Sequence, residues 1–249
     1  MASSSDLARF HECYQNWMTQ QQEDLGELIQ VYNQKPIEEE KLISVIDKVV
    51  EHMREYNNKR SEFAIVDAPS FISPTWCPSI ERSYLWIGGC RPSLGIRLLY
   101  WLCGSELETQ LSEYLQGVII GNVGELSADQ LNLVSELQLR TIKEEGRLSN
   151  KMASFQEDIA DNPLTGLAKN WDDPGTELNG QVERALDSHA KDLASILVDS
   201  DKLRLSNLKE LLGILTPLQA VDYLIASIKL HIRVHQWGLR RDEHHRRAA

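Results

Sequence analysis

The sequence predicts an all-α fold, a single bundle-like domain of long amphipathic helices. Apolar residues recur every three or four positions through long intervals, which is the helical period. The eight prolines leave these intervals free of helix breakers. No segment alternates with period two for long enough to propose a sheet, so helix packed on helix is the architecture that remains. Because no break in composition divides the chain, one domain is favoured over two.

The first two elements are long helices. Apolar and aromatic residues at helical spacing predict a helix over residues 7–32, interrupted by the polar run at 20–23. After Pro36, acidic residues at 38–40 suit the first turn of a helix, and an apolar stripe continues to Phe63. We therefore expect a second long helix that ends near residue 63.

Turns and then further helices follow. Residues 67–91 contain three prolines and two adjacent glycines, which predicts turns with one short helix around 80–86. Pro92 suits the first position of the next helix. Ser127 and Gln130 have capping-box spacing ahead of a stripe that reaches Ile159. An exposed loop is expected over 161–180, and helical patterns follow it over 178–196 and 203–215. A second capping box at Thr216 opens the last helix.

Composition describes an ordinary folded protein. Hydrophobic residues make up 42% and charged residues 25% of the chain, close to globular averages. The N-terminus lacks a secretion signal, and no apolar run approaches the length of a membrane span. Four cysteines lie far apart without a Cys-x-x-Cys pair, which favours reduced thiols packed as small apolar groups. We therefore expect a protein of the nucleus and cytoplasm with no membrane contact.

The charge is acidic but uneven. The net charge is −11, which opposes binding to a phosphate backbone. Residues from Lys229 to the C-terminus carry +4, leaving −15 on the remainder. The basic end, residues 239–249, is interpreted as complementing a helix dipole, with nuclear targeting or contact with an acidic partner as the alternative.

Four segments together resemble a known family. They are Tyr14–Met18, Ser73–Trp76, Trp86–Ser93 and Leu215–Ala220. The Trp-Ile-Gly-Gly-Cys-Arg-Pro-Ser run is the most specific of them. The chain resembles the delay-of-germination proteins and the related C-terminal domain of the TGA transcription factors, over residues 10–238. Because nine residues precede Phe10, the basic leucine zipper of TGA factors is not expected.

The resemblance implies a plant protein of seed dormancy and abscisic-acid signalling that contacts type 2C protein phosphatases, with self-association as a further contact. It also implies that Tyr14 and Trp17 lie in the segment that contacts the phosphatase, although Gln15 and Asn16 depart from the family pattern there. Core packing explains the two aromatic residues equally well. The alternative function is a DNA-associated regulator of transcription, which the net charge does not favour.

Histidines 231 and 235 carry the sharpest chemical hypothesis. They lie four residues apart, so both rings project from one face of the last helix. The family resemblance implies haem binding by this pair. Two axial ligands must approach iron from opposite faces, however, so one histidine would ligate while the other donates a hydrogen bond or meets another chain. A small metal ion and a purely structural pair are the alternatives.

Catalysis is not expected. The chain has no Gly-x-Ser-x-Gly, no His-Glu-x-x-His and no dinucleotide fingerprint, and its carboxylates are interpreted as solvating charge on helix faces. The Gly88–Pro92 segment before a helix could hold an anion. It lacks the Lys-Ser/Thr of a P-loop, so a structural turn is favoured.

Overall fold

The computed structural model describes residues 4–115, 126–161, 165–166 and 176–248. Its elements are α1 (Ser4–Asn33), α2 (Glu39–Ile72), α3 (Ser79–Ser83), α4 (Ser93–Leu115), α5 (Ala128–Glu157), the 3₁₀ turn η1 (Asp158–Ala160), α7 (Thr176–Ile214) and α8 (Pro217–Ala248). The described residues contain no β-strand and a single isolated bridge. The expected all-α class is confirmed.

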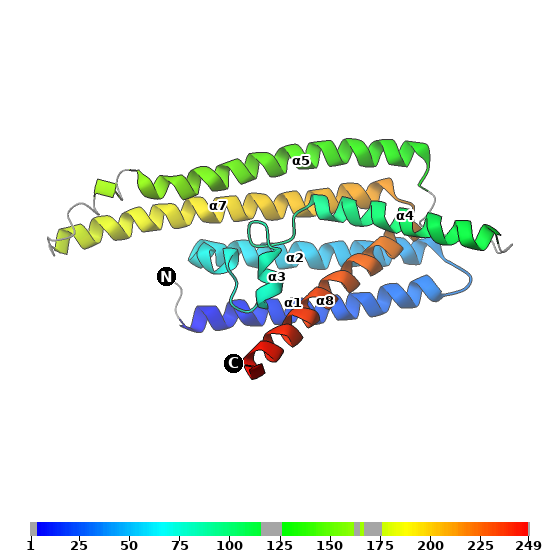
Figure 1. The fold of residues 1–249 in the computed structure, drawn as a ribbon, viewed down its shortest axis with the longest axis horizontal. Coiled ribbons are helices and arrows are strands. Elements are labelled where there is room, and N and C mark those ends of the chain that lie inside the picture. The colour runs from blue at the N-terminus through cyan, green and yellow to red at the C-terminus, as the bar shows by residue number, and fades with distance from the viewer. Residues whose placement is uncertain (1–3, 116–125, 162–164, 167–175, 249) are drawn as a thin grey trace.

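Four long helices lie roughly side by side, in the order α5, α7, α2 and α1 (Figure 1). α8 crosses α1 and α2 obliquely (Figure 1), and α4 contacts α5 and α8. α8 runs unbroken to Ala248, so residues 239–248 of the expected basic tail are helical. Among the described helices, none is both long enough and apolar enough to cross a bilayer.

The core has two parts, each built from several helices. One cluster joins α1, α2, α4, α5, α7 and α8 around residues such as Leu28, Ile96, Leu99, Leu211 and Val221. The other joins α1, α2, α5 and α7 around Phe10, Phe71, Leu148, Ile196 and Leu197. Complete burial of a large aliphatic or aromatic side chain contributes about 1.5–3 kcal/mol, so these stripes hold the bundle together.

Helix boundaries follow local capping chemistry where the caps are clear. Ser127 and Gln130 form a reciprocal capping box at the start of α5. Thr216 and Gln219 do the same for α8, through bonds of 2.9 and 3.4 Å. Pro217 occupies the first helical position, where its missing N–H costs nothing. Both predicted capping boxes are confirmed.

Two predicted boundaries were wrong. The second helix was expected to end near residue 63, with turns from residue 67, but α2 continues to Ile72. Its helical path breaks at Asp67 (φ −157°, ψ 80°) and then resumes, so Pro69 falls in the first turn of the resumed helix, where proline is tolerated. The loop expected over 161–180 lies largely outside the described residues, but residues 176–180 belong to α7.

Candidate functional site

The two histidines of the sequence hypothesis meet a buried carboxylate. Glu81, on the short helix α3, is 5% exposed. His235 Nδ1 lies 2.7 Å from Glu81 Oε2, and His231 Nε2 lies 3.8 Å from Oε1. The hydroxyl of Tyr14, from α1, donates to Glu81 Oε1 at 2.9 Å. The site therefore joins α1, α3 and α8 through one side chain that the sequence analysis did not single out.

Electrostatics hold Glu81 ionised. Burial alone would raise the pKa of this carboxyl, but His231, His235 and Tyr14 outweigh that effect and lower it far below its usual range. Burial and the neighbouring Cys77 and Glu81 raise the pKa of the Tyr14 hydroxyl, so it stays a proton donor. Cys77 is buried beside the same group, and burial and Glu81 raise its pKa to about 12.

In each of the two histidines, at least one ring nitrogen has a hydrogen-bond partner within the protein. His231 Nδ1 lies 2.5 Å from Gln21 Oε1 on α1. His235 Nδ1 is hydrogen-bonded to Glu81, and the Tyr14 hydroxyl lies 3.2 Å from the same nitrogen. Because both rings turn toward Glu81 from one face of α8, they cannot flank one iron atom. Glu81 orients the His235 ring through Nδ1, so Nε2 is the ring nitrogen of His235 that this carboxylate does not engage.

No cluster of three or more His, Cys, Asp or Glu side chains suited to a metal ion occurs among the described residues. His189 is half-buried, with its ring 5.7 Å from that of Phe155. His52 is half-buried, and its Nδ1 lies 2.8 Å from Oδ1 of the buried Asp24.

Tyr14 and Trp17 lie in different environments. Tyr14 is 7% exposed and its hydroxyl is engaged by Glu81. Trp17 is 8% exposed and stacks on Tyr56 of α2, with ring centroids 4.6 Å apart and an interplanar angle of 6°. Both side chains are therefore buried, and Trp17 is the one of the two that lines the groove between α1 and α2.

Trp17 and Tyr56 line a groove of about 300 Å³ between α1 and α2. We call this the α1–α2 groove. Its other walls include two cationic and two acidic side chains, one exposed and one half-buried amide, a half-buried thiol, a histidine and a phenylalanine. They are Arg9, Glu12, Cys13, Asn16, Gln20, His52, Glu55, Lys59 and Phe63. A mixed polar surface with an aromatic floor suits a protein side chain or helix better than a reacting small molecule.

The segment Trp86-Ile87-Gly88-Gly89, part of the family resemblance, forms a tight turn. Trp86 and Gly89 exchange backbone hydrogen bonds of 2.7 and 3.2 Å. The two central residues both have positive φ, 45° at Ile87 and 66° at Gly88, as in the hairpin turns that twist with the chain. A β-branched residue in this region is strained by about 1–3 kcal/mol, so other contacts must hold the turn.

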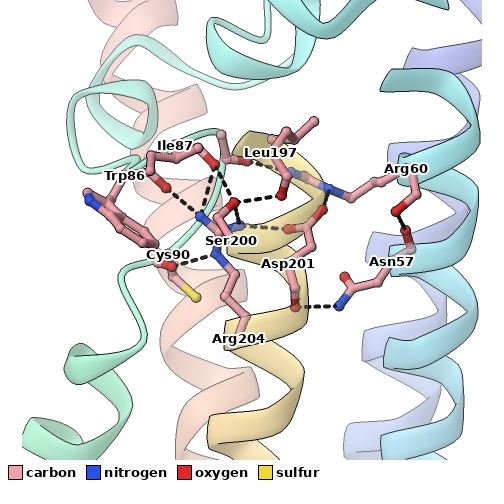
Figure 2. Close-up of polar contacts among 11 residues, drawn as sticks. Asn57, Arg60, Trp86, Ile87, Cys90, Leu197, Ser200, Asp201 and Arg204 are labelled. Atoms are coloured by element: carbon pink, nitrogen blue, oxygen red, sulfur yellow. Dashed lines mark hydrogen bonds and ion pairs between the residues drawn. The ribbon is translucent and has the colours of Figure 1, made fainter. Parts of the chain in front are cut away.

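Arg204 of α7 supplies those contacts (Figure 2). Its guanidinium donates to the carbonyl oxygens of Trp86, Ile87 and Cys90, the last two at 2.9 and 2.7 Å. Ser200 also lies within hydrogen-bond distance of the Ile87 carbonyl, at 3.5 Å. The same guanidinium pairs with Asp201 at 2.6 Å. The segment is therefore fixed from the α7 side.

Asp201 also binds Arg60 of α2, at 3.0 Å, and Arg60 donates to the Gly88 carbonyl at 3.0 Å (Figure 2). Burial lowers the pKa of Arg60, but Asp201 and Tyr56 reverse this and raise it above its ordinary value. A single carboxylate thus pairs with two guanidiniums whose side chains are each 10% exposed.

The anion that Gly88–Pro92 could hold is a carboxylate of the same chain. Glu145 of α5 is fully buried and accepts from the Ser93 backbone N–H at 2.6 Å and from Arg91 Nε at 2.7 Å. The N-terminus of α4 therefore already holds a carboxylate of the same chain. Glu81, Glu145 and Asp201 correct the interpretation that the carboxylates only solvate helix faces. Sequence gave no signal for them, since each occupies an ordinary helical position.

Cysteine placement matches expectation in part. Cys77 and Cys103 are buried, Cys13 is half-buried, and Cys90 is exposed, all as free thiols. The exposed Cys90 departs from the expected packing role, and its backbone carbonyl accepts a hydrogen bond from Arg204.

Comparison with known proteins bears on all these features. A family model named DOG1 and described as seed dormancy control matches residues 24–101. Protein DOG1-like 3 of Arabidopsis thaliana is 37% identical over 93% of this chain and 84% of its own length. Protein DOG1-like 1 of the same plant is 36% identical over 98% and 93%. Transcription factor TGA2.3 of Oryza sativa subsp. japonica is 28% identical over 90% of this chain and 62% of its own length.

These relatives carry the names of DOG1-like proteins and transcription factors, which describe regulators rather than enzymes. The identity to the DOG1-like proteins extends over nearly all of both chains, so the aligned region includes the helical domain described above. The chain therefore belongs to the DOG1-like family of plant regulatory proteins, with the TGA transcription factors as more distant relatives.

Proposed function

We propose that this protein is a non-enzymatic regulator of seed dormancy and germination that acts in abscisic-acid signalling by binding type 2C protein phosphatases. It would do so in the nucleus and cytoplasm. The family description of seed dormancy control supports the process. The observation that carries the mode of action is the α1–α2 groove, a surface suited to a partner and not to chemistry.

The groove favours a helical or extended protein segment. Two antiparallel helices leave a channel into which a third helix can lay its side chains. The stacked pair of Trp17 and Tyr56 gives this channel a flat aromatic floor, the residue type most enriched where binding energy concentrates. Arg9 and Lys59 against Glu12 and Glu55 provide charges of both signs, which favours a specific partner over a simple polyion.

Tyr14 has a different part in this proposal. Its hydroxyl is fixed by Glu81, so it positions α1 rather than touching the partner. Trp17 lies three residues later on the same helix and lines the groove itself. Of the two aromatic candidates, Trp17 would therefore make the contact.

The test is capture of purified abscisic-acid-pathway phosphatases by the intact protein. Filling the groove with Asn16→Trp should reduce capture about tenfold or more, since Asn16 lines the groove and is exposed. Gln15→Trp is the matched control, because Gln15 is an exposed neighbour outside the groove lining. Trp17→Ala serves as a second variant, with circular dichroism to check folding. Equal capture by the wild type and Asn16→Trp would refute the groove as the phosphatase site.

We further propose that haem binding modulates this regulator through His235. Haem would bring redox and gas-ligand chemistry to the protein. His235 would hold the haem through Nε2, Glu81 would orient the His235 ring through Nδ1, and His231 would stay hydrogen-bonded to Gln21. A hemin titration should then lose its Soret shift in His235→Ala and keep most of it in His231→Ala. An unchanged band in both variants would remove the pair from the site.

A DNA-associated regulator is the second candidate. The relationship to TGA transcription factors and the basic end of α8 favour it. The net charge of −11 opposes it. Titration of duplex DNA at increasing salt separates the two functions: a steep salt slope together with no phosphatase capture would favour DNA.

A further inference from the structure

One side of the last helix is basic and exposed. The residues Lys229, Arg233, Trp237, Arg240, Arg241 and His244 recur at spacings of three, four and seven, which places them on one face of α8. All six are exposed. We call this surface the α8 basic face. It spans about 22 Å along the helix.

The face carries no carboxylate of its own. The two acidic residues of this part of α8, Asp242 and Glu243, are turned to other partners. Asp242 accepts a hydrogen bond from the Ser79 backbone N–H at 2.9 Å, and Glu243 pairs with Arg247. Within the described chain, neither Arg240 nor Arg241 has an acidic group within ion-pair distance. The charges of Arg240 and Arg241 are therefore not neutralised by the described part of the bundle, whereas Lys229 lies near Asp222 of the same helix.

Apolar groups accompany the cations. The Trp237 side chain is 56% exposed in the middle of the face, and Leu230, two turns earlier, is 47% exposed at its edge. A face that served only to keep the helix in water would not need an exposed indole there. Tryptophan and arginine together are the residue types most enriched in the energetic centres of protein interfaces.

The opposite side of α8 fixes the direction in which this face points. His231 and His235 reach Glu81, and Gly238 packs so closely on Pro78 that an added Cβ would lie 2.6 Å from its ring. Buried Ile228 and Ile232 complete the inner side. The helix therefore cannot rotate to bury Trp237, and the basic face stays at the surface.

We propose that the α8 basic face binds an acidic segment of a partner protein that carries bulky apolar side chains among its carboxylates. The charge complementarity is direct, because this segment of the chain has +4 and the remainder −15. The remainder repels an extended polyanion such as a nucleic acid, whereas a short acidic segment meets only the basic face. Trp237 and Leu230 would contact its apolar residues. The inference rests on the proposed role as a partner-binding regulator but uses a surface separate from the α1–α2 groove.

The test is fluorescence anisotropy of a fluorescein-labelled synthetic peptide with the intact protein. The peptide has roughly 16 residues, so that it spans the face as a helix, and combines glutamates with two leucines seven positions apart. A second peptide replaces every glutamate by glutamine. A fluorescein-labelled DNA duplex of similar length is the third probe.

Charge reversal at the face should weaken binding of the acidic peptide at least tenfold in Arg233→Glu/Arg240→Glu. Trp237→Ala should weaken it several-fold, and the affinity should fall as salt rises. The double variant Lys143→Glu/Arg184→Glu is the control. It makes the same charge change at exposed cations on α5 and α7 and should bind within about twofold of the wild type.

Three results would overturn the proposal. They are no binding of the acidic peptide, equal binding of the glutamine peptide, or equal affinity in the face variant and the control variant. Tighter binding of the duplex than of the peptide would assign the face to nucleic acid instead. Because no phosphatase is present, these outcomes are independent of whether the α1–α2 groove captures its partner.

Discussion

The buried carboxylate of Glu145 closes the N-terminus of α4 by accepting hydrogen bonds from both the backbone N–H and the hydroxyl of Ser93, at 2.6 and 3.0 Å. This carboxylate comes from α5, more than fifty residues later in the chain. Glu145 of α5 therefore caps the N-terminus of α4. Through Arg91 it also links the turn at residues 86–89 to α5.

Removing this charge should destabilise the protein. Glu145→Gln keeps the shape but replaces one accepting oxygen with an N–H₂ group, which leaves Arg91 and Ser93 short of an acceptor. We expect the free energy of unfolding to fall by about 2–4 kcal/mol, measured by urea denaturation. Glu144→Gln is the control, because its partner Arg147 is exposed, and it should change stability by less than about 1 kcal/mol. Equal effects would contradict the capping role.

Stability should depend on the ionisation of Glu81. The pKa of this carboxyl is lower in the folded than in the unfolded protein, so folding is favoured where Glu81 is ionised. Its contribution should be complete above about pH 5 and be lost as pH falls below about 4, the range of an ordinary glutamate. Urea denaturation across this range should show a steeper acid loss for the wild type than for Glu81→Gln. Parallel curves would show that Glu81 is not responsible.

Asp201 should be the least replaceable polar residue of the α2–α7 contact. Asp201→Asn leaves the guanidiniums of Arg60 and Arg204 facing each other without a counter-charge. We expect a loss of about 3–5 kcal/mol in thermal or urea unfolding. Glu210→Gln, which removes the exposed partner of Arg140, is the matched control and should cost less than about 1 kcal/mol. A similar loss of unfolding free energy in both variants would mean that the buried Asp201 pairs contribute no more to stability than an exposed pair.

Two glycine substitutions should change the stability of the fold in opposite directions. Gly88 has φ +66°, and an added Cβ would lie 2.5 Å from the Phe71 carbonyl oxygen, so Gly88→Ala should cost at least about 2 kcal/mol. Gly146 lies inside α5 with nothing within 4 Å of an added Cβ, so Gly146→Ala should stabilise by about 0.5–1 kcal/mol. The melting temperatures of the two variants are the measurement. A neutral Gly88→Ala would show that the turn adapts.

The helices and their caps could be predicted because they depend on neighbours in sequence. The capping boxes at Ser127 and Thr216 use residues three positions apart, and the apolar stripes repeat with the helical period. The end of α2 was missed for a related reason: Pro69 signals a break, yet the break at Asp67 places it where a new helical turn tolerates it.

The candidate site was predictable only in part. Spacing placed His231 and His235 on one face of a helix, and the resemblance singled out Tyr14, yet nothing local showed that Glu81 joins all three. A carboxylate on a five-residue helix looks the same in sequence whether it faces water or a buried ring. Its role follows from α1, α3 and α8 meeting, which is a contact between residues distant in the chain.

By itself, the sequence determined that the chain is a bundle of capped amphipathic helices and that its last helix is basic, because periodicity, capping and charge are properties of nearby residues. The tertiary structure alone decided which of many similar carboxylates are buried, that Trp17 borders a groove while Tyr14 is held by Glu81, and that the basic face of α8 points outward. These outcomes depend on how one helix packs on another, and the cost of burying an unpaired charge then selects the partners.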